Sequence, residues 1–150
     1  IERIGDYAPN VAKRYIPLSM PPPVAPTGGL RHLADMAATA TREVLAAYRD
    51  GNVESAYRVW KNDVVLDEAY TGYFRELLTY MMEDPRNITP CTHLLFMAKN
   101  IERIGDHATN IAENTWFQVT GETLDSQRSK RDFTASPQLD RLGPPADNNN

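Results

Sequence analysis

The residues most able to do chemistry are carboxylates spaced four positions apart. Glu102 and Asp106 share this spacing, and Asn110 continues it by a further four residues. Asp63 and Asp67 repeat the spacing on a separate stretch of the chain. On a helix, side chains four residues apart lie on the same face. Because carboxylate and amide oxygens are the ligands that hard cations prefer, these residues are predicted metal ligands.

The segment that carries the first acid pair occurs twice. Residues 101–112 match residues 1–12 at nine of twelve positions, at an offset of one hundred residues. In the first copy the acids are Glu2 and Asp6, followed by Asn10. A repeat this long suits a duplicated small domain better than a solenoid unit. The two copies therefore predict two related acidic helix faces.

A structural interpretation of these acids competes with metal binding. A polar stripe on a helix is often only its solvated face, and acids can also meet Arg or Lys from a neighbouring helix. Acids four residues apart repel each other slightly. Asp63 and Asp67 also fall on the apolar face of their own helix, where an unpaired acid is costly. A bound cation relieves both costs, so we favour the metal hypothesis.

The repeated motif Ile-Glu-Arg-Ile-Gly-Asp-x-Ala-x-Asn resembles the PhoU family, the phosphate-specific transport system accessory proteins. The signature of that family is an E(D)xxxD motif on the last helix of each of two three-helix bundles. Residues 78–86 also resemble the family's segment before its final helix. The resemblance covers residues 1 to about 121.

The resemblance implies an all-α fold of PhoU-like three-helix bundles. The second bundle is expected to be complete, and the first is represented only by its last helix. We interpret the sequence as a fragment that lacks the first two helices of the first bundle. The expected organisation is a last helix of the first repeat at 1–16, a Pro/Gly linker at 17–29, a second repeat at 30–121 and a disordered tail at 122–150.

The resemblance also implies a function. Family members are cytoplasmic, usually dimeric regulators that restrain the phosphate-starvation response by binding the ATPase subunit of the phosphate ABC transporter and a sensor histidine kinase. They are also described as binding metal through the E(D)xxxD acids, as multinuclear iron clusters or as other divalent ions. Carried over to this chain, the metal is iron, manganese, magnesium or zinc, and the ligand candidates are Asp63, Asp67, Glu102, Asp106, Asn110, Glu2 and Asp6.

Three helices are expected to position the acids, over residues 30–50, 53–83 and about 90–120. Apolar residues and alanines in the first of them alternate spacings of three and four, which is typical of a packing seam: Leu30, Leu33, Ala37, Ala40, Val44 and Ala47. Thr89 is predicted to cap the last helix, with Pro90 at its first position.

Two smaller features carry expectations about packing. Gly105 lies between the apolar and acidic sides of its helix, where glycine costs about 1 kcal/mol, so we expect it to permit a close helix approach. The first helix, residues 1–16, contains Pro9 and has few predicted neighbours. We expect that helix to be poorly anchored or to use contacts from a neighbouring chain.

Composition narrows the classes of function. The net charge of −4 disfavours a nucleic-acid-binding protein, and no apolar run is long enough to predict a membrane-spanning helix. Cys91, the single cysteine, cannot form an internal disulfide and is expected to be a small buried residue. No catalytic motif occurs, so we do not predict an enzyme. The alternatives are a plain helical scaffold and, less favoured, a di-metal carboxylate enzyme, whose Glu-x-x-His motifs are missing.

Overall fold

The computed structural model describes residues 1–15 and 26–124. This part of the chain is mostly helical and contains no strand, which confirms the all-α prediction. The elements in order are α1 (Glu2–Tyr15), α2 (Gly28–Asp50), α3 (Val53–Glu83), the short 3-10 helix η2 (Pro85–Asn87) and α4 (Ile88–Thr120).

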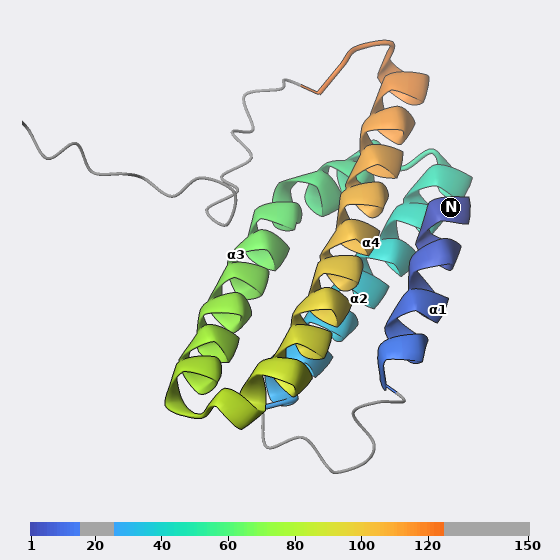
Figure 1. The fold of residues 1–150 in the computed structure, drawn as a ribbon. Helices are drawn as coiled ribbons and strands as arrows, with labels where there is room; N and C mark the ends of the chain where they lie inside the picture. The colour runs from blue at the N-terminus through green and yellow to red at the C-terminus, as the bar shows by residue number, and fades with distance from the viewer. Residues whose placement is uncertain (16–25, 125–150) are drawn as a thin grey trace, which may run out of the picture.

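The helices α2, α3 and α4 form an up-down-up three-helix bundle, and α1 lies along the outside of α4 (Figure 1). Short connections between consecutive helices force them to run antiparallel. The helices α2 and α4 consequently run in the same direction, and the longest helices, α3 and α4, face each other over most of their length.

The bundle buries the faces that the sequence predicted. Of the expected seam in α2, Leu33, Ala37, Val44 and Ala47 are almost fully buried. The core has two parts along the bundle axis, one with larger side chains and one rich in alanine. The larger part includes Leu33, Leu77, Leu94 and Cys91; the alanine-rich part includes Ala56, Ala108 and Ala112. Burial also raises the pKa of the Cys91 thiol, in keeping with its expected structural role.

The helix ends follow local chemistry. Gly51 and Gly121 both adopt the left-handed conformation, with φ of 62° and 74°, and end α2 and α4. Asn52 begins α3 by accepting a hydrogen bond from the Ser55 amide at 3.0 Å. A two-residue connection thus turns the chain from α2 into α3.

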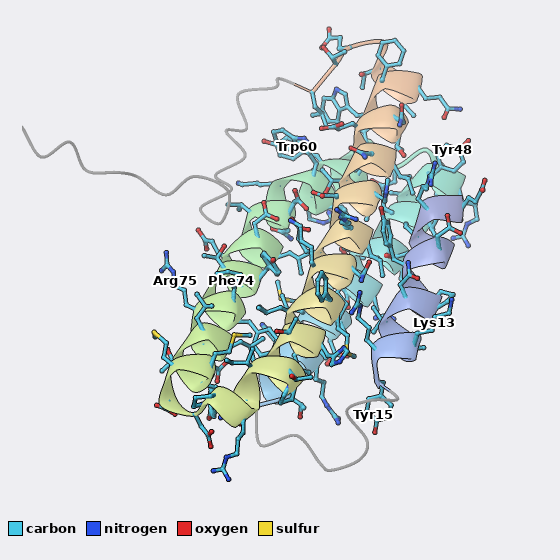
Figure 2. All side chains as sticks on the ribbon, viewed as in Figure 1. Lys13, Tyr15, Tyr48, Trp60, Phe74 and Arg75 are labelled. Atoms are coloured by element: carbon cyan, nitrogen blue, oxygen red, sulfur yellow. The ribbon has the colours of Figure 1, made fainter. Side chains whose placement is uncertain are left out.

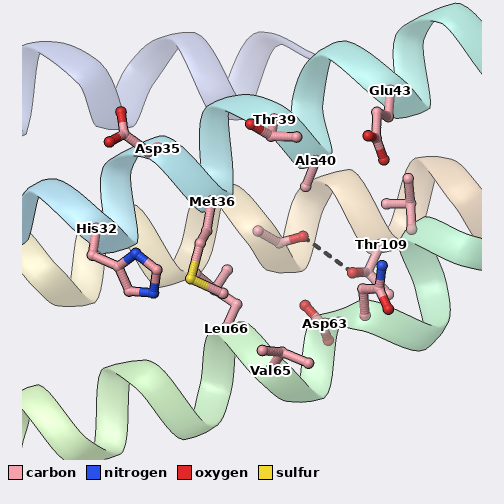
Figure 3. Close-up of a pocket in the computed structure, with 13 residues that line it drawn as sticks. His32, Asp35, Met36, Thr39, Ala40, Glu43, Asp63, Val65, Leu66 and Thr109 are labelled. Carbon is pink, nitrogen blue, oxygen red and sulfur yellow. Dashed lines mark hydrogen bonds between the residues drawn. The ribbon is translucent and has the colours of Figure 1, made fainter.

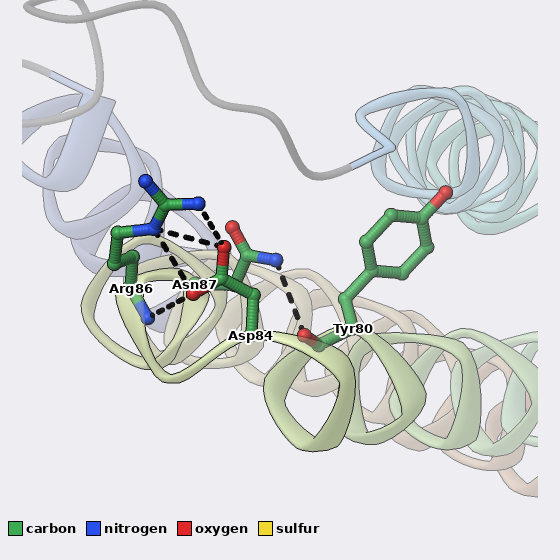
Figure 4. A network of polar contacts seen from close by, with 4 residues as sticks. All are labelled: Tyr80, Asp84, Arg86 and Asn87. Atoms are coloured by element: carbon green, nitrogen blue, oxygen red, sulfur yellow. Dashed lines mark hydrogen bonds and ion pairs between the residues drawn. The ribbon is translucent and has the colours of Figure 1, made fainter.

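The corner between α3 and α4 differs from the prediction. The last helix begins at Ile88 and Asn87 precedes it, so Thr89 lies inside the first turn and does not cap the helix. Pro90 is tolerated there because the first amides of a helix lack intrahelical acceptors. Figure 4 shows the polar contacts that shape this corner: Asp84 accepts bonds from Arg86, and the Asn87 Nδ2 donates to the Tyr80 carbonyl at 3.2 Å.

The first helix was expected to be poorly anchored or to use contacts from a neighbouring chain; the structure shows it in contact with another helix of its own chain. The helix α1 packs on α4 of the same chain, although none of its residues is fully buried. Tyr7 stacks on His107, and the Arg14 guanidinium lies 4.1 Å from the centre of the Phe96 ring. Pro9 is accommodated within the helix. The sequence of α1 does not predict that this helix packs on α4.

Other expectations about chain organisation lie outside the described residues. These include most of the Pro/Gly linker and most of the tail, residues 16–25 and 125–150. Gly28 and Gly29, placed in the linker from the sequence, form the start of α2. Among the helices described, none is apolar enough over a sufficient length to cross a membrane.

Candidate metal centre

Three of the predicted ligands converge on the seam between α3 and α4. One carboxylate oxygen from each of Asp63, Asp67 and Asp106 lies within 4.8 Å of the other two. Asp63 is only 6% exposed, and the other two residues are half-buried. In the described part of the chain, these residues are the one group of three or more acidic, histidine or cysteine side chains with this spacing. We call them the acidic trio.

Gly105 allows α3 and α4 to come close enough for the three aspartates to meet. A Cβ atom added to Gly105 would collide with the Leu66 Cδ2 of α3 and would stand 3.9 Å from the Asp63 Oδ1. The two helices therefore approach each other closely where α4 has no side chain. Asp106 follows Gly105 directly, so the same approach brings its carboxylate to α3. This contact confirms that glycine permits close packing here.

Polar contacts between α3 and α4 flank the trio on both sides. Toward the start of α3, the Trp60 Nε1 donates a hydrogen bond to the Glu113 Oε1 at 3.1 Å. Toward the other end of the seam, the Lys99 ammonium lies 5.1 Å from the centre of the Tyr70 ring. Figure 2 labels Trp60 between the upper parts of α3 and α4. These contacts help to hold the register in which the three aspartates meet.

The remaining predicted ligands lie outside the trio. Glu102 is on the same seam, where its carboxylate accepts a hydrogen bond from the Lys99 Nζ at 3.0 Å and is 13% exposed. Asn110 is exposed, one turn beyond Asp106. Glu2 and Asp6 are exposed on α1. A metal-binding role for these four residues remains a prediction.

The donor set of the trio suits a hard divalent cation. Carboxylate oxygens are preferred by magnesium, manganese and calcium, and are also used in some iron sites. Carboxylates gathered this closely attract a divalent cation electrostatically. Such ions usually take six or more ligands, so three carboxylates would leave positions for water or for a group from another molecule.

Sequence reasoning missed the aromatic edge of this site. The ring of Tyr57 lies 5.7 Å from that of Trp60 and 5.8 Å from that of Trp116, measured between ring centroids. A signal was present, since Trp60 precedes Asp63 by three residues and Asp67 by seven and thus shares their face.

Comparison with known proteins identifies related chains. The model of the PhoU domain matches residues 30–115. A phosphate-specific transport system accessory protein PhoU homolog from Xylella fastidiosa is 58% identical over 140 residues, which cover 93% of this chain and 59% of the relative. The corresponding protein of Rhizobium meliloti is 52% identical over 139 residues, or 91% of this chain and 58% of the relative.

The fold is also similar to a solved structure. The crystal structure of PhoU from Pseudomonas aeruginosa superposes with a TM-score of 0.77 at 39% identity. The match covers 81% of this chain and 58% of that structure. The chain thus spans less than two thirds of the length of these relatives.

Proposed function

The chain belongs to the PhoU domain family, and from that premise we propose that it regulates phosphate uptake by binding other proteins. The observation that carries the proposal is the match of residues 30–115 to the PhoU domain, together with relatives named as accessory proteins of a phosphate-specific transport system. An accessory role requires a recognition surface and no turnover. The family match therefore favours a binding protein over an enzyme.

The proposed partners are the ATPase subunit of the phosphate ABC transporter and a sensor histidine kinase. In this role the protein acts as a cytoplasmic homodimer. It represses the phosphate-starvation response while phosphate is plentiful. Several large apolar side chains along α3 and α4 are well exposed and supply contact area for a partner: Tyr57, Val64, Met82, Ile88 and Phe117. Aromatic and methionine side chains are enriched in protein interfaces.

We further propose that the acidic trio holds iron, manganese, magnesium or zinc. The support is geometric: Asp63 and Asp67 on α3 meet Asp106 on α4. A cation there would supply positive charge, tie α3 to α4 and leave coordination positions open toward the surface. Metal occupancy would then alter the face that a partner contacts.

Elemental analysis tests the metal proposal. The purified chain should carry stoichiometric metal after loading with manganese or iron, and the double variant Asp63→Asn/Asp106→Asn should carry none. The matched control is Glu54→Gln/Glu68→Gln, which removes two charges from exposed positions of α3. Equal metal content in the wild-type chain and the aspartate variant would refute the site.

A pull-down with the transporter ATPase subunit tests the partner proposal separately. Tyr57→Ala and Phe117→Ala, on α3 and α4, should weaken capture, and the exposed Tyr15→Ala on α1 should not. If the intact chain fails to retain the ATPase subunit with and without metal, the transporter is not its partner. Capture by the metal-free chain would show that binding does not depend on the trio.

A further inference from the structure

The helix α3 carries two parallel seams, of which only one lies in the core. The first seam has alternating spacings of three and four residues, and all of its members are buried: Ala56, Val59, Asp63, Leu66, Tyr70, Tyr73 and Leu77. The residues that directly follow these, continued to Met81, form a second seam with the same spacing: Tyr57, Trp60, Val64, Asp67, Thr71, Phe74, Leu78 and Met81. We call this second seam the outer stripe.

The outer stripe is largely apolar and is left open to solvent. Six of its eight residues are apolar, and none of the eight is buried. Tyr57, Val64 and Leu78 are 41%, 48% and 38% exposed. Figure 2 labels Trp60 and Phe74, two further members, on α3. An apolar seam with this alternating spacing is the pattern by which one helix packs along another, so the outer stripe is suited to an additional helix.

The outer stripe is complementary to a reversed copy of itself. When a second α3 runs antiparallel to the first, with the two-fold axis at Ala69, residues equally far from Ala69 lie opposite each other. Every apolar member of the stripe then meets an apolar member of the second copy, in the pairs Tyr57 with Met81, Trp60 with Leu78 and Val64 with Phe74. A two-fold interface needs this self-complementarity, because the same surface serves both copies.

The polar residues match in the same register. Asp67 and Thr71, the two members of the outer stripe that are not apolar, lie opposite each other. The Thr71 hydroxyl can donate a hydrogen bond to the carboxylate of the second copy's Asp67, and the symmetry makes this contact twice. A shift by one heptad in either direction places Asp67 against Val64 or Leu78, which donate no hydrogen bond to a carboxylate. The polar pair therefore selects one register.

We propose that two copies of this chain pair through the outer stripe, with their α3 helices antiparallel about Ala69. The apolar pairs supply the buried area, and the pairing of Asp67 with Thr71 fixes the register. This inference rests on the homodimer of the proposed function and specifies its contact surface. It requires neither a bound metal nor the ATPase subunit.

Sedimentation equilibrium of the metal-free 150-residue chain measures the pairing. Val64→Lys places an ammonium opposite the second copy's Phe74 and should raise the dimer dissociation constant by at least about tenfold. Val65→Lys is the matched control, because Val65 is 50% exposed but lies about 100° around the helix, where it borders a pocket between α2 and α3 (Figure 3). Circular dichroism checks that both variants keep their helices.

A thiol crosslink tests the orientation of the two helices. The exposed Glu68 lies next to the axis, so a short bismaleimide should join Glu68→Cys to the same residue of the second copy. The exposed Met82 lies thirteen residues from Ala69, which puts two Met82→Cys thiols about 40 Å apart, so that variant should not crosslink. Cys91 is buried and present in both variants, and it therefore gives the same background.

Three results would overturn the proposal. The first is a folded chain that is monomeric at all concentrations at which it stays soluble. The second is equal weakening by Val64→Lys and Val65→Lys, and the third is equal crosslinking of Met82→Cys and Glu68→Cys. A monomer that still captures the ATPase subunit would refute the pairing alone. A dimer that does not capture it would refute the transporter partner and leave the pairing in place.

Discussion

Tyr7 and His107 occupy the same position in the two copies of the repeat, and their rings stack on each other with centroids 5.7 Å apart. Arg103 also faces the Tyr7 ring at 5.9 Å, and Arg14 faces Phe96. Residue numbers thus rise along α1 as they fall along α4. Equivalent positions that face each other across antiparallel helices indicate a local two-fold relation between the copies.

The stacking predicts how α1 is held. Tyr7→Ala removes the ring that faces both His107 and Arg103, so α1 should detach more often and its amides should exchange faster, by about 1 kcal/mol in local opening free energy. Hydrogen exchange with mass spectrometry measures this. Tyr15→Ala, at an exposed position of the same helix, is the control. Unchanged exchange in Tyr7→Ala would show that other contacts anchor α1.

The two repeat glycines should respond oppositely to alanine. A Cβ at Gly105 collides with buried Leu66, whereas nothing lies within 4 Å of a Cβ at Gly5. Overpacking costs about 1–3 kcal/mol and alanine returns about 1 kcal/mol of helix propensity, so Gly105→Ala should lower the free energy of unfolding by about 1 kcal/mol. Gly5→Ala should be neutral or stabilising. Urea unfolding of both variants measures these changes. A more stable Gly105→Ala variant would contradict the interpretation that Gly105 permits close approach of α3 and α4.

Charge repulsion in the acidic trio predicts that Asp67→Asn stabilises the metal-free chain but reduces the stabilisation that metal provides. When a chelator removes metal, Asp67→Asn should raise the free energy of unfolding by about 0.5 kcal/mol, because it reduces repulsion toward Asp63 and Asp106. With manganese at a hundred times its Kd, the wild-type chain should gain about 2.7 kcal/mol and the variant much less. Thermal unfolding with and without metal measures both, with Glu68→Gln as control. Destabilisation by Asp67→Asn in the absence of metal would show that repulsion among the three carboxylates is not the dominant effect at this position.

The contacts of Asp84 at the corner before α4 predict that part of the free energy of unfolding is lost at acidic pH. Hydrogen bonds from the Arg86 side chain and amide hold the pKa of Asp84 below its usual value. A lowered folded-state pKa stabilises the protein above the ordinary Asp pKa of about 4, and this contribution is lost as the pH falls through the lowered value. Asp84→Asn should therefore destabilise the chain at pH 6 and converge with wild type toward pH 2. A constant difference across that range would exclude the ion pair as the cause.

Much of the fold could be read from the sequence because helical periodicity is local. The spacing of apolar residues predicted the buried face of α2, and the glycines at positions 51 and 121 marked two helix ends. The start of α4 was less predictable, because Thr89 and Asn87 are both acceptable near a helix start. The contacts of Asn87 and Asp84 with α3 and the corner decide between them.

By itself the sequence determined the family, through the repeated motif, and the angular position of each acid around its own helix. Tertiary structure decided which acids meet. Asp63 and Asp67 join Asp106, while Glu102 lies one turn away beside Lys99. The physical reason is that a helical period sets directions around one axis, whereas the separation and register of two axes depend on packing. Here the absence of a side chain at Gly105 sets how closely α3 and α4 approach.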